Sequence, residues 1–253
     1  MRIKYLGNHT PKSEKLYKYI ENNHPEYLTE ENPDLIIVAG GDGSILHAIQ
    51  DYSDLNIPFF GIGLGTLNFL MNEISKPKKL MRTILEKRLD IVDARSMSVR
   101  VIRNGKSVFS GLATNDIMLG KGIMDYHKFI VNSDDSTFND KFIEGQSLIV
   151  STAIGSSAIS LNNNVASIPS LDMDLFALSS VLASRETTTK KFIASNQKIE
   201  IKINSERHEC QLFVDGNATV FDLERGDKVI VKRGKKIQFA FLNYKEFEIK
   251  RLS

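Results

Sequence analysis

The chain has 253 residues, of which 42% are hydrophobic and 25% are charged, and its formal net charge is +2. This composition is typical of a globular protein long enough for two domains, and the weak net charge argues against a dedicated nucleic-acid surface. A single cysteine, Cys210, excludes an internal disulfide and a cysteine-rich metal site. We expect a cytoplasmic protein, because the sequence has neither the apolar core of a signal peptide nor a run long enough to span a membrane.

The first part of the chain has the pattern of an open α/β sheet, in which short apolar strands alternate with amphipathic helices. Strands are predicted at residues 3–7, 35–39 and 57–62, and helices at residues 11–23, 44–52 and 77–88. Ser44 is the predicted cap of the second helix, because a serine before the first apolar position can accept hydrogen bonds from the free N–H groups of the first turn.

A glycine turn with one carboxylate, Gly40-Gly41-Asp42-Gly43, separates the second strand from the second helix. Glycines let a ligand approach the main chain closely, and a helix start with free N–H groups binds anions. A carboxylate repels phosphate there unless it holds a metal or accepts a proton from an attacking hydroxyl. The same residues also suit a plain tight turn. The flanking strand and helix favour a ligand site, because open α/β sheets bind ligands where their strands end.

A second glycine-rich loop follows the third strand, with glycines at Gly61, Gly63 and Gly65. Its spacing matches neither the dinucleotide fingerprint nor the Walker phosphate loop, so by itself it fits a tight strand exit as well as a ligand loop. If the second and third strands are neighbours, the two glycine loops lie side by side over the same crevice.

From about residue 90 the hydrophobic period shortens to two, which predicts mainly antiparallel β structure. We place the domain boundary near residue 94, giving domains over 1–94 and 95–253, with the last residues able to return to the first domain. Asn104-Gly105 predicts a tight hairpin turn. Further strands are predicted at residues 198–204, 210–214 and 228–232.

Three polar segments interrupt this β region. Asn115-Asp116 breaks an apolar run and offers an amide and a carboxylate to ribose hydroxyls, although a bend with side-chain hydrogen bonds explains it equally well. Small hydroxyl residues surround Gly155 after an apolar strand, which suits close contact with a ribose or phosphate. Asp215-Gly216 is most economically a hairpin turn.

In their order and spacing these motifs resemble the NAD kinase family over most of the chain. That family has a Gly-Gly-Asp-Gly turn, a Gly-x-Asn-x-Gly-x-Leu-Gly-Phe-Leu loop and an Asn-Glu pair. It also has an Asp-Gly-Leu strand leading into Ser-Thr-Pro-x-Gly-Ser/Thr-Thr-Ala-Tyr, and a late Val-Asp-Gly. The corresponding residues here are 40–43, 61–70, 115–116, 146–159 and 214–216.

The chain departs from the family pattern at several positions. Gly63 stands at the asparagine of the loop, and Asn68 stands at its last glycine. Asp116 is one methylene shorter than the glutamate of the pattern, Gln146 stands at its aspartate, and Ile159 stands at its tyrosine. The phosphate-handling half is therefore close to the pattern and the dinucleotide-reading half is altered, which leaves lower activity, a changed acceptor or lost catalysis open.

The resemblance implies an N-terminal α/β (Rossmann-like) domain that binds the phosphate donor and a C-terminal β-sandwich-type domain that binds NAD. The implied reaction moves the γ-phosphoryl group of ATP, or of polyphosphate, to the 2′-hydroxyl of the adenosine ribose of NAD, with Mg²⁺ or another divalent cation. The implied partners are NAD, ATP and further copies of the chain, in a homodimer or homotetramer where a neighbouring subunit completes the site. Neither a nucleic acid nor a membrane is expected as a partner.

Roles follow by position from the same resemblance. The implied catalytic residue is Asp42, as the base or as a holder of Mg²⁺; no residue is assigned as a metal ligand. The implied phosphate and ATP contacts are Gly40, Gly41, Gly43, Ser44, Gly61, Gly63 and Gly65. The implied NAD contacts are Asp42, Gly43, Asn115, Asp116, Gln146, Thr152, Ser157, Ala158 and Asn162.

Two rival functions stay open on the sequence. Lipid kinases of the diacylglycerol and sphingosine type carry a similar Gly-Gly-Asp-Gly turn, but the chain has no basic amphipathic stretch for a membrane surface. A dinucleotide-binding protein without catalysis is the other rival, and it is motivated by the changes at Gly63, Gln146 and Ile159.

Overall fold

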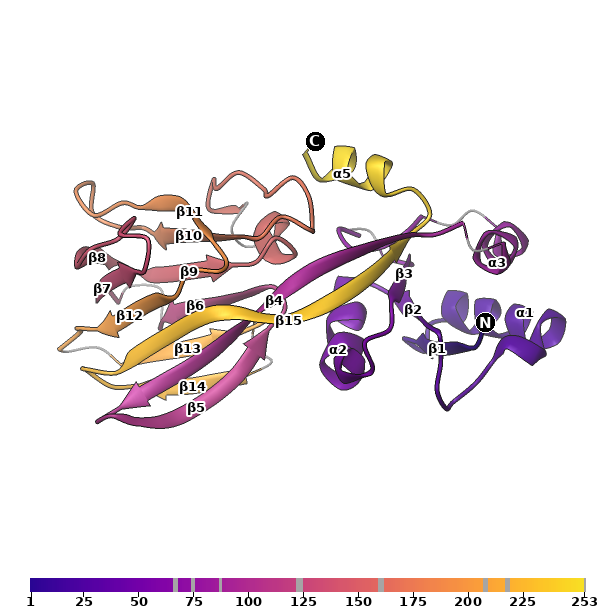
Figure 1. Ribbon diagram of the computed structural model, residues 1–253, viewed down its shortest axis with the longest axis horizontal. Helices are drawn as coiled ribbons and strands as arrows, with labels where there is room; N and C mark the ends of the chain where they lie inside the picture. Colours follow the sequence, from indigo (N-terminus) through magenta and orange to yellow (C-terminus); the bar gives the residue numbers. More distant parts are fainter. Residues whose placement is uncertain are drawn as a thin grey trace. The chain divides into compact units, whose positions relative to one another are not determined.

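The computed structural model describes residues 1–65, 68–73, 76–86, 88–121, 125–158, 162–206, 209–216 and 219–252. The chain divides into two compact units, and Figure 1 colours them by sequence. Unit 1 comprises Met1–Ala94 together with Lys236–Ser253, and unit 2 comprises Arg95–Lys235. The predicted Ile159 departure lies outside the described residues.

Unit 1 is built on a parallel sheet. Its strand order is β1 (Ile3–Gly7), β2 (Leu35–Gly40), β3 (Phe59–Gly63) and the end of β15 (Lys228–Phe241). All six residues of β2 are buried, which explains why that strand is apolar throughout rather than alternating. The helices of this unit are α1 (Pro11–Asn23), α2 (Asp42–Tyr52), α3 (Pro77–Leu85) and α5 (Tyr244–Leu252), with short 3₁₀ turns at Pro25–Tyr27 and Ser53–Leu55.

The ends of two helices differ from the sequence predictions. The predicted Ser44 cap is wrong, because Gly41 is extended and starts α2 at Asp42 without a side-chain cap. Ser44 instead lies against Gly40, where a Cβ would collide with its hydroxyl. Helix α3 ends at Leu85, three residues early, because the N–H of Arg88 donates to the carbonyl of Thr83 and leaves the helical pattern.

Unit 2 is a sandwich of two antiparallel sheets, as the period of two predicts. One sheet has the order β5-β4-β15-β12-β7-β8 and the other β11-β10-β9-β6-β13-β14. The first sheet contains β4 (Asp90–Arg103), β5 (Lys106–Ala113), β7 (His127–Ser133), β8 (Lys141–Gly145) and β12 (Ile199–Ile203). The second contains β6 (Asp116–Gly120), β9 (Ser147–Ser151), β10 (Leu175–Val181), β11 (Lys190–Ala194), β13 (Cys210–Val214) and β14 (Thr219–Leu223).

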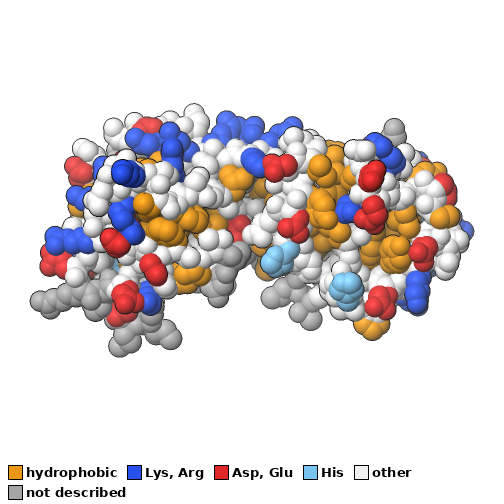
Figure 2. All heavy atoms as spheres, turned by 90° about the horizontal axis from the view of Figure 1, so that it is seen from below, with side chains coloured by type: hydrophobic (Ala, Val, Ile, Leu, Met, Phe, Trp, Pro, Cys, Tyr) orange, Lys and Arg blue, Asp and Glu red, His pale blue; other side chains and the backbone are white. Residues whose placement is uncertain are grey.

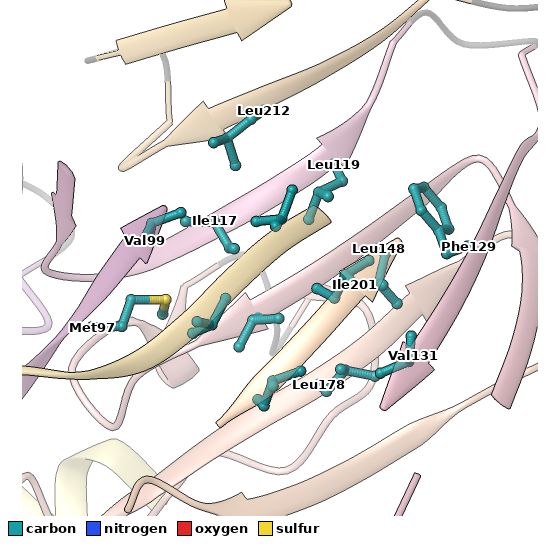
Figure 3. Close-up of a cluster of buried hydrophobic side chains, with 14 of the residues drawn as sticks. Met97, Val99, Ile117, Leu119, Phe129, Val131, Leu148, Leu178, Ile201 and Leu212 are labelled. Atoms are coloured by element: carbon teal, nitrogen blue, oxygen red, sulfur yellow. The ribbon is translucent and has the colours of Figure 1, made fainter. Parts of the chain in front are cut away.

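The core of unit 2 lies between the two sheets (Figure 3). Val99, Phe129 and Ile201 enter it from the first sheet, and Leu119 and Leu148 enter it from the second. Alternate residues of β12 are buried, so the apolar side chains of this strand face the opposite sheet.

The predicted hairpin at Asn104-Gly105 is confirmed. Both residues have positive φ, 51° and 76°, which is the backbone of the tight turn that matches the twist of paired strands. Acidic and basic side chains both occur on the face shown in Figure 2, in keeping with the weak net charge. Among the described residues, no helix has the length and apolarity that a membrane crossing requires.

An arginine at the end of β4 closes one edge of the sandwich. The Arg103 guanidinium donates to both oxygens of Asp227, at 2.9 and 2.7 Å, and to Glu224 at 2.6 Å. Asp227 is buried, so the guanidinium neutralises a carboxylate that has left water.

Replacing Arg103 with alanine is expected to destabilise the protein by about 3 kcal/mol, because Asp227 would stay buried without its cationic partner. Urea unfolding measures the change. Arg100→Ala is the control, since Arg100 is exposed on the same strand and its loss should cost less than about 0.5 kcal/mol. Equal losses for the two variants would contradict this account.

Candidate active site

The carboxylate of Asp42 is fixed by two backbone N–H groups from the segment that follows β3. Phe69 N donates to Oδ2 and Leu70 N donates to Oδ1, each at 2.9 Å. Because each oxygen has its own donor, the carboxylate cannot rotate freely. Asp42 is half-buried, and each of its oxygens keeps further acceptor capacity for a ligand.

The glycine turn around Asp42 leaves open space and free donors. A Cβ at Gly41 or at Gly43 would meet no described atom within 4 Å. Among the described residues, nothing accepts a hydrogen bond from the N–H of Asp42 or Gly43. Helix N-termini attract anions through such amides and through the helix dipole, so this turn can receive a phosphate.

The second glycine loop lies next to the first. Gly40 at the end of β2 is paired with Gly63 at the end of β3, and the N–H of Leu64 donates to the Gly40 carbonyl at 2.8 Å. Gly61 approaches the returning chain so closely that a Cβ there would collide with Met71. Gly65 is exposed.

A buried asparagine that the sequence analysis did not single out ties this region together. The Asn72 amide nitrogen donates to the carbonyls of Gly61 and Ala240, at 3.0 and 3.1 Å, and its oxygen accepts from Leu242 N at 2.8 Å. Asn72 thus joins β3 to the end of β15. One polar residue after an apolar run carries no periodic signal that could reveal this role.

A second residue that the sequence analysis missed is Arg251 of α5. It is buried, and burial lowers its pKa to about 10, while the charges of Asp42 and Glu248 oppose that decrease. At neutral pH the guanidinium stays charged and contributes positive potential at Asp42.

Unit 2 holds the Asn115-Asp116 segment by a carboxylate from the β13–β14 hairpin. Asp215 accepts hydrogen bonds from the backbone N–H groups of Thr114, Asn115 and Asp116 at 2.8, 2.7 and 3.2 Å. Burial raises the pKa of Asp215, although these three bonds act against the increase. The predicted hairpin turn at Asp215-Gly216 is confirmed, and its acid also positions the segment opposite.

The segment after β9 holds the same residues from the other side. Thr152 Oγ1 donates to the Thr114 carbonyl at 2.6 Å, and Thr152 N donates to the Asn115 carbonyl at 2.8 Å. At Gly155 any Cβ would collide with the backbone of Asn115, so this position requires glycine. The Asn115 Oδ1 atom is buried and has no partner among the described residues.

The other predicted NAD contacts lie at different places in unit 2. Ser157 is buried in the short 3₁₀ turn Gly155–Ser157, Ala158 follows it, and Asn162 is exposed. Gln146 is not brought to this cluster. In the β6–β9 register Asp116 pairs with Ser151 while Gly120 pairs with Ser147, which puts Gln146 at the opposite end, at least about 13 Å away along the strand.

No group of three or more His, Cys, Asp or Glu side chains in the described part of the chain could hold a metal ion.

Unit 1 presents open amides and one fixed carboxylate where parallel strands end, and unit 2 holds an amide and two carboxylates in a β-sandwich. Together with the Gly-Gly-Asp-Gly turn, these features define a two-domain nucleotide phosphotransferase.

The chain belongs to the ATP-NAD kinase family. The family's N-terminal domain matches residues 7–89 and its C-terminal domain matches residues 74–242. A NAD kinase of Rickettsia rickettsii is 31% identical over 73% of this chain and 70% of its own length. A NAD kinase of Nitrosospira multiformis is 30% identical over 84% of this chain and 72% of its own length.

Two solved structures have the same fold. Yeast NADH kinase complexed with NADH gives a TM-score of 0.81 at 19% identity, over 99% of this chain and 86% of the other. An NAD kinase from Archaeoglobus fulgidus in complex with ATP gives a TM-score of 0.74 at 17% identity, over the whole of both chains. The predicted fold class, a parallel α/β sheet followed by antiparallel β-sheets, is confirmed.

The buried carboxyl of Asp116 predicts a pH dependence of stability. Burial raises its pKa from 3.8 to about 7, and the charge of Asp215 adds to the increase. The folded protein therefore keeps a proton on Asp116 that the unfolded chain releases, and stability falls as pH rises from about 4 to about 7.

Replacing Asp116 with asparagine should remove that loss, which is on the order of 3 kcal/mol between pH 5 and pH 8. Urea unfolding at pH 5 and pH 8 measures it for the wild type and the variant. Asp222→Asn, an exposed position on β14 of the same sheet, should leave the pH dependence unchanged. An undiminished pH dependence in Asp116→Asn would contradict the assignment.

Proposed function

We propose that this protein transfers the γ-phosphoryl group of ATP to the 2′-hydroxyl of the adenosine ribose of NAD, giving NADP. Membership of the ATP-NAD kinase family supports this assignment. The observation that carries it is the fixed carboxylate of Asp42 beside an open glycine turn.

Phosphoryl transfer depends on positioning and on stabilising charge more than on covalent chemistry by the protein. The backbone amides of Asp42 and Gly43 bind the phosphate chain of the donor in this proposal. Asp42 orients the 2′-hydroxyl and accepts its proton as the new phosphate ester bond forms and ADP leaves.

Mg²⁺ fits this arrangement as a partner of the nucleotide. The half-buried Asp42 carboxylate is the group of the turn that can reach it, because its oxygens retain acceptor capacity beyond the two backbone bonds. When bound, the ion would neutralise charge on the transferring phosphate.

In unit 2, Asn115 and Asp116 bind ribose or amide groups of NAD, and Ser157 and Ala158 line the adenosine pocket. The rigid backbone of residues 114–116 supports this proposal, as does the unpartnered Asn115 Oδ1. Gln146 acts in the site of a neighbouring copy in a homodimer or homotetramer, which accounts for its distance from Asp116.

Incubation of the protein with NAD, ATP and Mg²⁺ tests the assignment, with NADP formation as the readout. Polyphosphate in place of ATP identifies the donor. NADP formation with either donor supports the proposal. Dinucleotide binding without NADP would make the chain a binding protein, and phosphorylation of diacylglycerol or sphingosine in place of NAD would make it a lipid kinase.

Asp42→Asn is expected to lower kcat by about 10²- to 10⁴-fold, because an amide cannot accept the proton of the 2′-hydroxyl. The dissociation constant for ATP should change little, since the backbone amides of the turn remain. Steady-state kinetics and calorimetric titration measure the two effects. Asp51→Asn, an exposed position on the same helix, is the control. Near-normal turnover in Asp42→Asn would remove Asp42 from the chemistry.

A further inference from the structure

Two departures from the family pattern, Gly63 and Asn68, meet in space. A Cβ built on Gly63 would lie 2.7 Å from Asn68 Cγ and 2.8 Å from its Nδ2. Real Cβ atoms essentially never come within 3.0 Å of another such atom, so a side chain at position 63 would require the Asn68 side chain to move. The amide of Asn68 therefore occupies the space that a side chain at position 63 would enter.

The Asn68 amide also closes the loop on which the Asp42 clamp is built. Its Nδ2 donates to the carbonyl of Gly65, three residues earlier in the loop, at 2.9 Å. Its Oδ1 is buried and has no partner among the described residues. A buried acceptor without a hydrogen bond raises the free energy of the folded state, so Oδ1 does not stabilise this position of the amide. Packing and the hydrogen bond to Gly65 hold the amide in place.

The next two residues are the ones that hold Asp42. Phe69 N and Leu70 N donate to the two carboxylate oxygens, and both amides follow Asn68 directly in the chain. A more flexible backbone at position 68 would also displace these two N–H donors, because they belong to the next two residues. Glycine has more backbone freedom than any other residue, so a glycine there would loosen the clamp unless another group held the loop.

We infer that Asn68 is a positioning residue for Asp42, and that the asparagine of the family loop has been exchanged between its two ends. In the family pattern the asparagine stands at position 63 and the glycine at position 68. Here each stands in the place of the other, and one amide still fills the space beside the end of β3. The kinetic part of this inference rests on the proposed function.

The exchange makes a sharp prediction about single and double variants. Gly63→Asn alone puts a second side chain into occupied space, and Asn68→Gly alone leaves that space empty and the loop unclosed. The double variant moves the amide back to position 63 and opens the space for it. The two changes should therefore rescue each other, because residues in contact have non-additive effects.

Measurement of kcat, the KM for ATP and the thermal midpoint for these three variants and the wild type forms the test. Asn68→Gly should lower kcat by about 10- to 100-fold, because a misplaced catalytic group costs that much, while the KM for ATP changes by less than about threefold. Gly63→Asn should lower both kcat and the thermal midpoint. The double variant should recover kcat to within about threefold of the wild type.

Asn56→Gly is the matched control, because Asn56 is in unit 1, away from the loop, and has a φ of 53° that glycine accepts. It should leave kcat unchanged. Additive losses in the double variant, or a raised KM with normal kcat in Asn68→Gly, would overturn the inference.

A wild-type protein that makes no NADP would refute the proposed function, and with it the positioning of Asp42 for that reaction. The thermal midpoints of the single and double variants would then test the exchange of the asparagine between positions 63 and 68. Recovery in the double variant would support it, and additive losses would refute it.

Discussion

The structure around the candidate site depends on one interaction. The carboxylate of Asp42 accepts hydrogen bonds from two backbone N–H groups. The donors, Phe69 and Leu70, lie more than 25 residues further along the chain, so the bond joins the start of α2 to the segment after β3. A charged acceptor makes stronger hydrogen bonds than a neutral one. The acid of the glycine turn is therefore part of the fold and is also a group that can react.

Unit 2 uses the same device with a different result. Asp215 accepts hydrogen bonds from three consecutive backbone amides, but it lies within a hairpin rather than at the start of a helix. Its hydrogen bonds fix the backbone of the Asn115-Asp116 segment. Asp42 keeps one side toward the open space over Gly41 and Gly43. The comparison separates the two acids: Asp215 fixes other groups in place, and Asp42 is itself fixed where a ligand can reach it.

The sequence predicted the strands of unit 1, several strands of unit 2, most helices and the hairpin at Gly105, because period and turn residues report local backbone preferences directly. It assigned no strand where the structure has β7, β8, β10, β11 and β14. It missed the clamp from Phe69 and Leu70, since backbone donors have no side-chain signature. It also missed Asn72, whose partners are distant in the chain. The separation of Gln146 from the other NAD contacts follows from strand register, which motif spacing does not contain.

Departures from a family pattern have to be judged in space rather than counted along the chain. Gly63 and Asn68 are two separate departures in the sequence, yet the two positions are adjacent in the structure, and our inference treats them as one exchange around a single amide. Asp116 is a conservative shortening in the sequence, yet burial raises its pKa to about 7, so that its carboxyl holds a proton at pH values where an exposed aspartate is ionised. In our proposal Asp116 faces the dinucleotide, so the proton that it keeps near pH 7 would change the charge that the dinucleotide meets.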